Sequence, residues 1–341
     1  MKKLWILVAF VAFTLFLAAC GSDNNEETTG NDGSEDTSEE QNNESSEDSS
    51  NDSEENSSYV VEHAMGETEI EGQPEDIVIL TNHGTEALLS LGITPVGAVQ
   101  SWTGDPWYDH IEDDMEGVNV VGLENDISLE SIAELDPDLI IGNKMRQEDQ
   151  YEQLSAIAPT VFEETLRGDW KVNFELIAEA VGMPEKGQEV LDEYNNRVDQ
   201  LASDLEENGK LDTKVSIVRF MAGDVRIYHK DSFSGIILEE IGLERPEAQD
   251  KDDFAAKNVT KERIDEMDGD VIFYFTYETG DGEASTVEEE WINDPLWNNL
   301  SAVEAGNVHE VSDTIWNTAG GVRAANLMLD DLEQYLLNSD S

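Results

Sequence analysis

Two fourteen-residue segments of the chain resemble each other, and this internal repeat restricts the folds that the chain can adopt. Residues 128–141 (SLESIAELDPDLII) align without gaps against residues 260–273 (TKERIDEMDGDVIF). Each copy starts with a hydroxyl residue suited to capping a helix, has an acid in the first turn, and ends in a tight turn and a buried strand. A shorter repeat pairs residues 87–93 with residues 237–243. The repeats predict two similar lobes built from helices and strands.

Short apolar segments alternate with helical patterns on both sides of residue 200. We expect strands at 76–80, 95–99, 118–121, 139–141, 160–162, 215–220 and 270–275, and helices at 86–91, 129–135, 150–157, 235–241 and 322–337. Buried strands that alternate with helices are typical of an α/β fold with a mainly parallel sheet.

The pattern changes between residues 184 and 210, where apolar residues recur at helical spacing until Asn208-Gly209. This long helix should join the lobes. The predicted fold class is therefore α/β, with two Rossmann-like lobes joined by one long helix and a ligand cleft between the lobes. We assign 59–183 to the N-terminal lobe, 184–210 to the connecting helix and 211–341 to the C-terminal lobe. A connecting helix is stiffer than a loop, so the closure of the lobes should be modest.

The first twenty residues have the pattern of an export signal. Lys2 and Lys3 precede an apolar run of fourteen residues, 4–17, which is shorter than the about 20 residues of a membrane span. The run ends in LAAC, which resembles the lipobox of bacterial lipoproteins. The resemblance implies that residues 1–19 are removed and that Cys20 carries a lipid, which holds the protein at the extracellular face of the cell membrane. The alternative is an ordinary secretory signal. Cys20 is the only cysteine in the sequence, so no disulfide is expected.

Acidic residues dominate the chain. Fourteen of them lie between residues 21 and 58, which contain no Lys or Arg, and we interpret 20–58 as the lipidated cysteine and a disordered tether. An acidic interaction tail is the alternative. The net charge of −59 argues against binding to nucleic acid or to an anionic membrane surface. Such acidity suits a saline habitat, where salt screens the repulsion.

Four segments carry a resemblance to a known family: 140–146 (IIGNKMR), 164–170 (ETLRGDW), 219–228 (RFMAGDVRIY) and 314–321 (TIWNTAGG). Over residues 60–337 the chain resembles the iron–siderophore-binding lipoproteins of Gram-positive bacteria, among the helix-linked periplasmic binding proteins. It is most similar to receptors for citrate-hydroxamate or citrate siderophores. The resemblance implies a monomer that is not an enzyme, that captures a ferric siderophore and that delivers it to a dimeric ABC permease. The chelator holds the iron, so neither a cofactor nor a protein metal ligand is expected.

Basic residues lie close to the predicted cleft. Lys144 and Arg146 follow the strand 139–141, and the carboxyl end of a strand is where open α/β folds bind ligands. Arg219 lies near the end of its strand, and Arg226 lies just beyond it. Arginine suits carboxylate or hydroxamate oxygens because its planar fork donates two parallel hydrogen bonds. The alternative for each arginine is a salt bridge to one of the many carboxylates.

Tryptophans could supply apolar walls, although a single tryptophan more often lies in a core. His83 follows the first strand and could lie near the cleft, while Arg167, Trp316 and Asn317 come from segments that carry the resemblance. The full set of candidate ligand-binding residues is His83, Trp102, Lys144, Arg146, Arg167, Arg219, Arg226, Trp316 and Asn317.

Glu130 and Glu262 occupy matching first-turn positions of the long repeat. In the family that the chain resembles, this position carries the acid that docks onto an arginine of the permease. A favourable interaction with the helix dipole would also explain an acid there.

Other classes of protein find less support. The sequence has no phosphate-binding glycine loop after a strand and no nucleophile elbow, and its five histidines are not spaced as a zinc site. A haem or cobalamin receptor of the same fold remains an alternative, as does a surface-anchored hydrolase.

Overall fold

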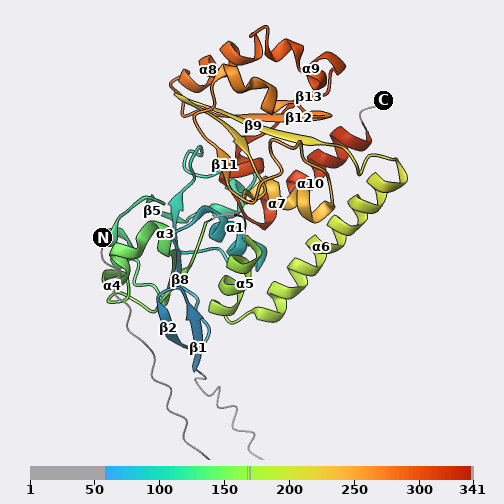
Figure 1. Ribbon diagram of the computed structural model, residues 1–341. Helices are drawn as coiled ribbons and strands as arrows, with labels where there is room; N and C mark the ends of the chain where they lie inside the picture. Colours follow the sequence, from blue (N-terminus) through green and yellow to red (C-terminus); the bar gives the residue numbers. More distant parts are fainter. Residues whose placement is uncertain (1–57, 167, 169, 339–341) are drawn as a thin grey trace, which may run out of the picture. The chain divides into compact units, whose positions relative to one another are not determined.

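A computed structural model of the chain describes residues 58–166, 168 and 170–338 (Figure 1). The predicted signal, the lipidation site Cys20 and the tether up to residue 57 lie outside the described residues, and so does the candidate ligand residue Arg167. The described residues all belong to one compact unit, Glu54–Ser341. No helix within them has the length and the apolar composition of a membrane span.

The N-terminal sheet has the strand order β6-β5-β4-β3-β7-β8 and is parallel except at the β5–β6 pair. Its strands are β3 (Ile77–Ile79), β4 (Gly97–Gln100), β5 (Asn119–Leu123), β6 (Asp126–Ile127), β7 (Leu139–Asn143) and β8 (Thr160–Glu163). The chain builds outward from β3 through β4 and β5, and then returns to place β7 on the other side of β3. This reversal forms a topological switch point, where such sheets bind ligands. A hairpin of β1 (Ser58–His63) and β2 (Gly66–Glu71), which we did not predict, precedes the sheet.

The C-terminal sheet has the order β11-β10-β9-β12-β13. Its strands are β9 (Val215–Met221), β10 (Asp224–Tyr228), β11 (Ala255–Ala256), β12 (Val271–Tyr277) and β13 (Val308–Glu310). Strands β9, β12 and β13 are parallel, whereas β10 and β11 are antiparallel additions. Strand β10 returns along β9 after the two-residue turn Ala222-Gly223, where Gly223 has φ of 71°. Arg226 therefore lies within strand β10. Our prediction that it lies just beyond the end of a strand was wrong.

Both sheets are buried on two faces. In the N-terminal sheet, Ile77 and Ile79 face the core that includes α1 and α5, while Val78 packs on the opposite side with residues of α2 and α4. The helices are α1 (Asn82–Ser90), α2 (Leu129–Glu134), α3 (Lys144–Gln147), α4 (Tyr151–Leu154), α5 (Trp170–Ala180), α6 (Pro184–Glu207), α7 (Phe233–Ile241), α8 (Glu283–Ile292), α9 (Ser301–Ala305) and α10 (Val322–Leu337). Burial on both faces explains why these strands are continuous apolar runs.

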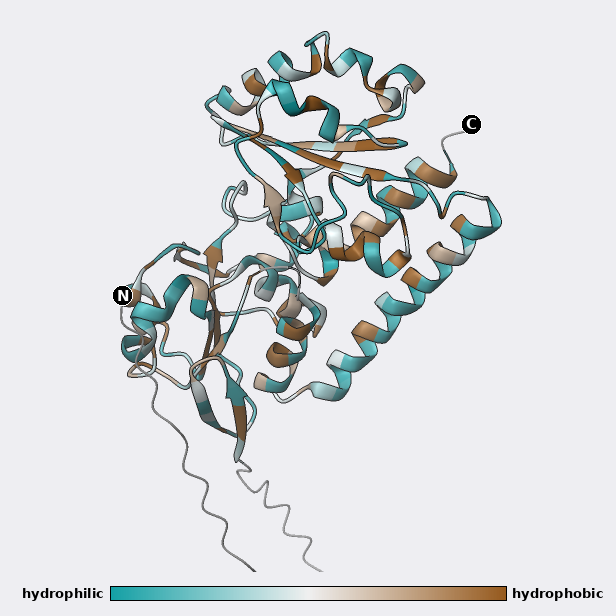
Figure 2. Cartoon of the chain, viewed as in Figure 1, coloured by the Kyte–Doolittle hydropathy of each residue, from teal (hydrophilic) through white to brown (hydrophobic). Residues whose placement is uncertain are grey.

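Helix α6 is the long helix that joins the two sheets, and it ends at Glu207 before the turn at Asn208. Its buried residues include Tyr194, Val198 and Leu201, which recur at the predicted spacing and belong to a core shared by both lobes. Full burial of one such side chain stabilises the fold by about 1.5–3 kcal/mol. Figure 2 shows hydrophobic residues along the sheet strands, and hydrophilic residues over much of α6.

The two copies of the long repeat differ in the helix that each of them forms. Ser128 accepts a hydrogen bond from the backbone N–H of Ser131 and caps α2, as predicted. Thr260 precedes a 3₁₀ segment, η3 (Lys261–Met267), and makes no side-chain cap. The backbone departs from helical geometry at Arg263, so the second copy does not form a regular α-helix.

Helix α10 forms a second connection between the lobes. Glu86 of α1 is fully buried, and its Oε2 accepts the backbone N–H of Ala324 at 3.0 Å. Arg323 donates to the carbonyl of Leu89 at 3.0 Å and pairs with Asp114. The first turn of α10 is thereby held against the N-terminal lobe, and we call this set of contacts the α10 anchor.

Candidate functional site

A cavity of about 350 Å³ lies between the two lobes. It is lined by Asn82, His83, Trp102, Glu124, Arg146, Leu166, Trp170, Asn173, Arg219, Met221, Arg226, Tyr228, Phe233, Phe254, Tyr277, Asn317, Thr318, Ala319 and Gly320. The set mixes charged, amide and aromatic side chains, which is typical of a site that orients a small ligand with a few polar groups on an apolar wall.

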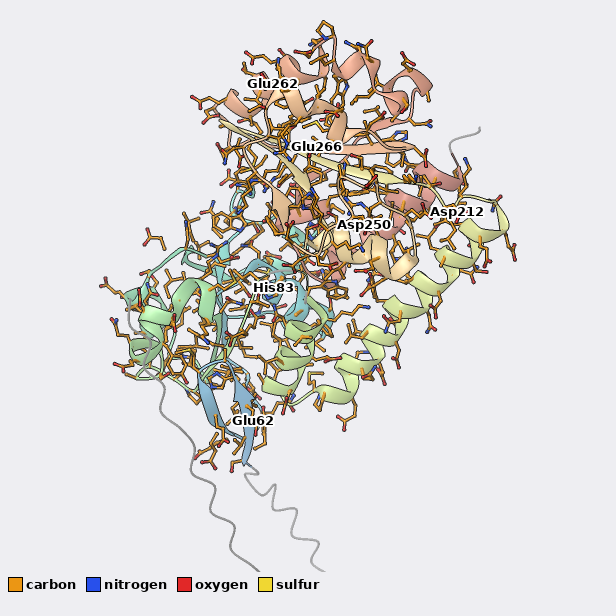
Figure 3. The ribbon with its side chains drawn as sticks, viewed as in Figure 1. Glu62, His83, Asp212, Asp250, Glu262 and Glu266 are labelled. Atoms are coloured by element: carbon orange, nitrogen blue, oxygen red, sulfur yellow. The ribbon has the colours of Figure 1, made fainter. Side chains whose placement is uncertain are left out.

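The N-terminal side of the cavity is at the switch point of the sheet. His83 lies in the first turn of α1, directly after β3, and Arg146 lies in α3, directly after β7. Strands β3 and β7 are parallel neighbours, so both side chains reach the same sheet edge. Figure 3 labels His83, which lies between the lobes in that view.

A buried carboxylate orients His83. Its Nε2 lies 2.7 Å from Oε1 of Glu163, and the other oxygen of Glu163 accepts a bond from Nδ2 of Asn143 at 3.2 Å. Burial favours the neutral imidazole, but the charge and the hydrogen bond of Glu163 outweigh burial and raise the pKa of His83. The imidazole is therefore biased towards its cationic form at the cavity floor.

Arg146 pairs with Glu124, whose Oε1 accepts from Nε at 3.1 Å. Glu124 is held in place by the backbone N–H of Asn82 at 3.1 Å and by the Asn82 amide at 2.8 Å. The Arg146 guanidinium lies 5.8 Å from the centre of the Trp102 ring, within the range of a cation–π contact. The Arg146 side chain is 40% exposed, so it is open to a ligand, whereas Glu124 is only 5% exposed.

The hairpin of β9 and β10 provides the C-terminal side. Arg219 and Arg226 are directly opposite each other across the two strands and share one face. Arg219 donates from Nε to Asp313 at 2.6 Å and from Nη1 to the Tyr228 hydroxyl at 3.0 Å. Burial disfavours its charge, but Tyr228 and Asp313 outweigh burial and raise the pKa of Arg219. Arg226 donates from Nε to Asp224 at 2.6 Å.

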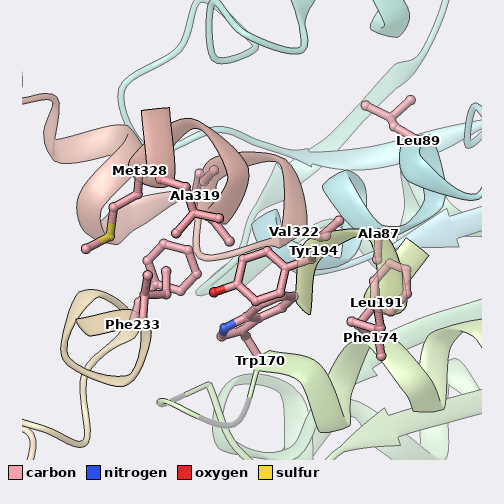
Figure 4. Packing of buried hydrophobic residues seen from close by; sticks show 14 of the residues in the cluster. Ala87, Leu89, Trp170, Phe174, Leu191, Tyr194, Phe233, Ala319, Val322 and Met328 are labelled. Carbon is pink, nitrogen blue, oxygen red and sulfur yellow. The ribbon is translucent and has the colours of Figure 1, made fainter. Parts of the chain in front are cut away.

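Aromatic rings form the apolar part of the wall. Trp170, which begins α5, meets Tyr194 of α6 edge to face, with ring centres 5.0 Å apart (Figure 4). Phe233 of α7 lies next to it, with ring centres 6.3 Å apart. The Trp170 Nε1–H is buried and has no hydrogen-bond partner within the described part of the chain. It is therefore a donor that a ligand oxygen could satisfy.

Of the candidates predicted from the sequence, the cavity brings together His83, Trp102, Arg146, Arg219, Arg226 and Asn317. Asn317 belongs to a π-helical turn, Thr314–Thr318, a feature often found at functional sites.

Two other candidates lie away from the cavity lining. Trp316 is fully buried, stacks on Phe273 with ring centres 4.6 Å apart, and donates from Nε1 to Asp331 at 2.8 Å. It is a core residue, which corrects our expectation of an apolar wall at this position. Lys144 pairs at 2.9 Å with the exposed Glu164. Other residues of the cavity lining, for which we predicted no role from the sequence, are Asn82, Glu124, Leu166, Asn173, Tyr228, Phe233, Phe254, Tyr277, Thr318, Ala319 and Gly320.

Both predicted docking acids are exposed. Glu130 lies in the first turn of α2, and Glu262, labelled in Figure 3, lies in the first turn of η3. Among the residues that the structure describes, no three His, Cys, Asp or Glu side chains form a group that could hold a metal ion.

A family model described as periplasmic binding protein matches residues 77–314. The chain belongs to this family. Members bind ligands rather than catalyse reactions, in agreement with our expectation that the chain is not an enzyme. The matched region includes β3, α6 and all strands of the C-terminal sheet, so it covers both lobes.

Relatives of this binding protein carry more specific names. A probable siderophore-binding lipoprotein of Bacillus subtilis, YfiY, is 52% identical over 82% of this chain and 88% of its own. The achromobactin-binding periplasmic protein of Dickeya dadantii is 31% identical over 76% of this chain and 85% of its own. The crystal structure of Staphylococcus aureus SirA complexed with staphyloferrin B is 34% identical, covers 82% of this chain and 98% of that chain, and has a TM-score of 0.77.

Proposed function

We propose that this binding protein captures a ferric siderophore outside the cell and delivers it to an ABC importer for iron uptake. The observation that carries the proposal is the cavity itself, where three arginines and His83 meet aromatic walls between the lobes. The names of the relatives of this protein support the same ligand class. A chelated ferric ion presents oxygen atoms and an organic backbone, and these match the cationic and aromatic parts of the lining.

The arginines provide the polar part of recognition. A guanidinium donates two parallel hydrogen bonds to a carboxylate or hydroxamate, and each charge-assisted bond contributes about 1.5–3 kcal/mol. Arg146 and Arg226 are the more exposed of the three, so they should contact the ligand directly. Arg219 is held by Asp313 and Tyr228 and should act from deeper in the wall.

The finer proposal is a siderophore of citrate-hydroxamate type. Its support is the sequence resemblance to receptors of that class. We further propose that a lipid on Cys20 tethers a monomeric receptor to the membrane, and that Glu130 and Glu262 contact the two halves of the permease. A double charge reversal, Glu130→Lys with Glu262→Lys, should stop import while the affinity for the ligand remains intact. A loss of affinity would argue against a docking role.

Tryptophan fluorescence of the full-length chain in detergent tests the ligand assignment. We would titrate the protein with ferric schizokinen, ferric citrate, haem, cobalamin and free Fe³⁺. Saturable quenching by a ferric siderophore is expected, and Arg146→Ala or Arg226→Ala should raise Kd about 10- to 100-fold. Lys144→Ala is the matched control, because this lysine pairs with Glu164 away from the cavity lining. Binding of haem or cobalamin alone would replace the siderophore assignment and leave the family unchanged.

A further inference from the structure

On the N-terminal side of the cavity, each cationic residue is paired with a carboxylate. His83 lies 2.7 Å from Glu163, and Arg146 lies 3.1 Å from Glu124. Glu124 itself lines the cavity, so a ligand that approaches Arg146 also approaches a negative charge. Neither carboxylate can turn away readily, because Asn82 holds Glu124 and Asn143 holds Glu163.

The same pairing occurs on the β9–β10 hairpin. Arg219 is bonded to Asp313 at 2.6 Å, and Arg226 is bonded to Asp224 at 2.6 Å. Asp224 is fixed at both oxygens, since Oδ1 also accepts the backbone N–H of Asn258 at 2.7 Å. The bond to Asp224 uses the Nε–H of Arg226, so the Nη groups of this arginine are not committed to it.

The three arginines, and His83 in its protonated form, are thus matched by four carboxylates in direct contact with them. A ligand meets many hydrogen-bond donors but little net positive field. Donors recognise oxygen atoms whatever the total charge of the ligand, whereas each additional negative charge on the ligand is repelled by the paired carboxylates. The arrangement favours an oxygen-rich complex with a small net charge over a strongly anionic one.

We infer that Glu124 and Asp224 are specificity-determining residues, which restrict this receptor to ferric siderophores of low net negative charge. The inference rests on the proposed function and adds the ligand charge to it. These two carboxylates are the informative ones, because each is paired with one of the more exposed arginines, Arg146 or Arg226.

Two isosteric variants test the inference, Asp224→Asn and Glu124→Gln, each made in the full-length chain. Glu290→Gln is the control, since Glu290 is exposed on α8, which packs against the opposite face of the β9–β10 hairpin from the arginines. The probes are ferric schizokinen and the more anionic ferric complex of two citrates. Competition titration would give the ratio of the two Kd values for each protein, at low salt and at about 0.5 M salt.

The wild type should prefer ferric schizokinen. Each variant should shift the ratio towards the dicitrate complex by about tenfold for each unit of charge that separates the probes, and high salt should reduce the shift. An unchanged ratio in both variants, an equal loss of affinity for both probes, or a wild-type preference for the dicitrate complex would overturn the inference. If the wild type bound neither probe, the proposed function itself would fail.

Discussion

Replacing Glu86 with alanine should destabilise the protein by about 3–5 kcal/mol. The carboxylate is fully buried, its Oε1 contacts Nε2 of His110, and its Oε2 accepts the N–H of Ala324 in the first turn of α10. A hydrogen bond to a charged group contributes about 1.5–3 kcal/mol, and a buried anion at a helix N-terminus adds up to about 2 kcal/mol. The alanine variant loses both contributions and leaves buried donors unpaired.

Differential scanning calorimetry at pH 7 measures this effect. At about 2 °C per kcal/mol for a chain of this size, Tm should fall by about 6–10 °C. Glu86→Gln keeps an acceptor but loses the charge, so its Tm should lie between those of the alanine variant and the wild type. Glu179→Ala on the exposed face of α5 is the matched control and should change stability by no more than about 0.5 kcal/mol. A Tm of Glu86→Ala within about 1 °C of the wild type would refute the role of the α10 anchor.

Three further predictions concern stability. Gly321→Ala should cost about 1–3 kcal/mol in urea unfolding, because the new Cβ would lie 2.5 Å from Oε2 of Glu86; an unchanged midpoint would contradict this packing. Backbone N–H groups at the start of α8 lower the pKa of Glu278 to about 2, so its contribution is present above the unfolded pKa of about 4.3 and is lost as the pH falls. The difference in Tm between the wild type and Glu278→Gln should therefore shrink below about pH 4. A difference that does not change with pH would contradict this role of Glu278. Glu163 raises the pKa of His83, so the charged pair contributes fully below the unfolded pKa of about 6.5 and is lost as the pH rises through the raised value. The difference in Tm between the wild type and His83→Gln should be largest at acidic pH. A difference that grows as the pH rises would contradict the stabilising role of the charged pair.

Part of the site could be predicted from general rules of α/β folds. His83 and Arg146 were found because each follows a recognisable buried strand, and parallel strands end at the same sheet edge. Arg219 was found for a similar reason. The hairpin that brings Arg226 opposite Arg219 was missed, because its turn, Ala222-Gly223, is not one of the Asn-Gly or Asp-Gly pairs that mark hairpins in a sequence.

Other residues depend on packing that local patterns do not encode. Tyr277 reaches the cavity because β12 continues beyond Phe275, where we had ended the strand. Glu124 lies in the short β5–β6 connection, and nothing in the local pattern marks a buried acid there. Trp316 is directed into the core by Asp331, fifteen residues further along the chain, so its role could not be read from its own segment.

The α10 anchor has a consequence for the timing of ligand exchange. The cavity wall at residues 317–320 leads directly into α10, so its position is tied to α1 of the N-terminal lobe as well as to the C-terminal sheet. Because the cavity wall is already in place, ligand binding does not require a rarely populated conformer. A low population of binding-competent molecules therefore does not limit the rate of capture.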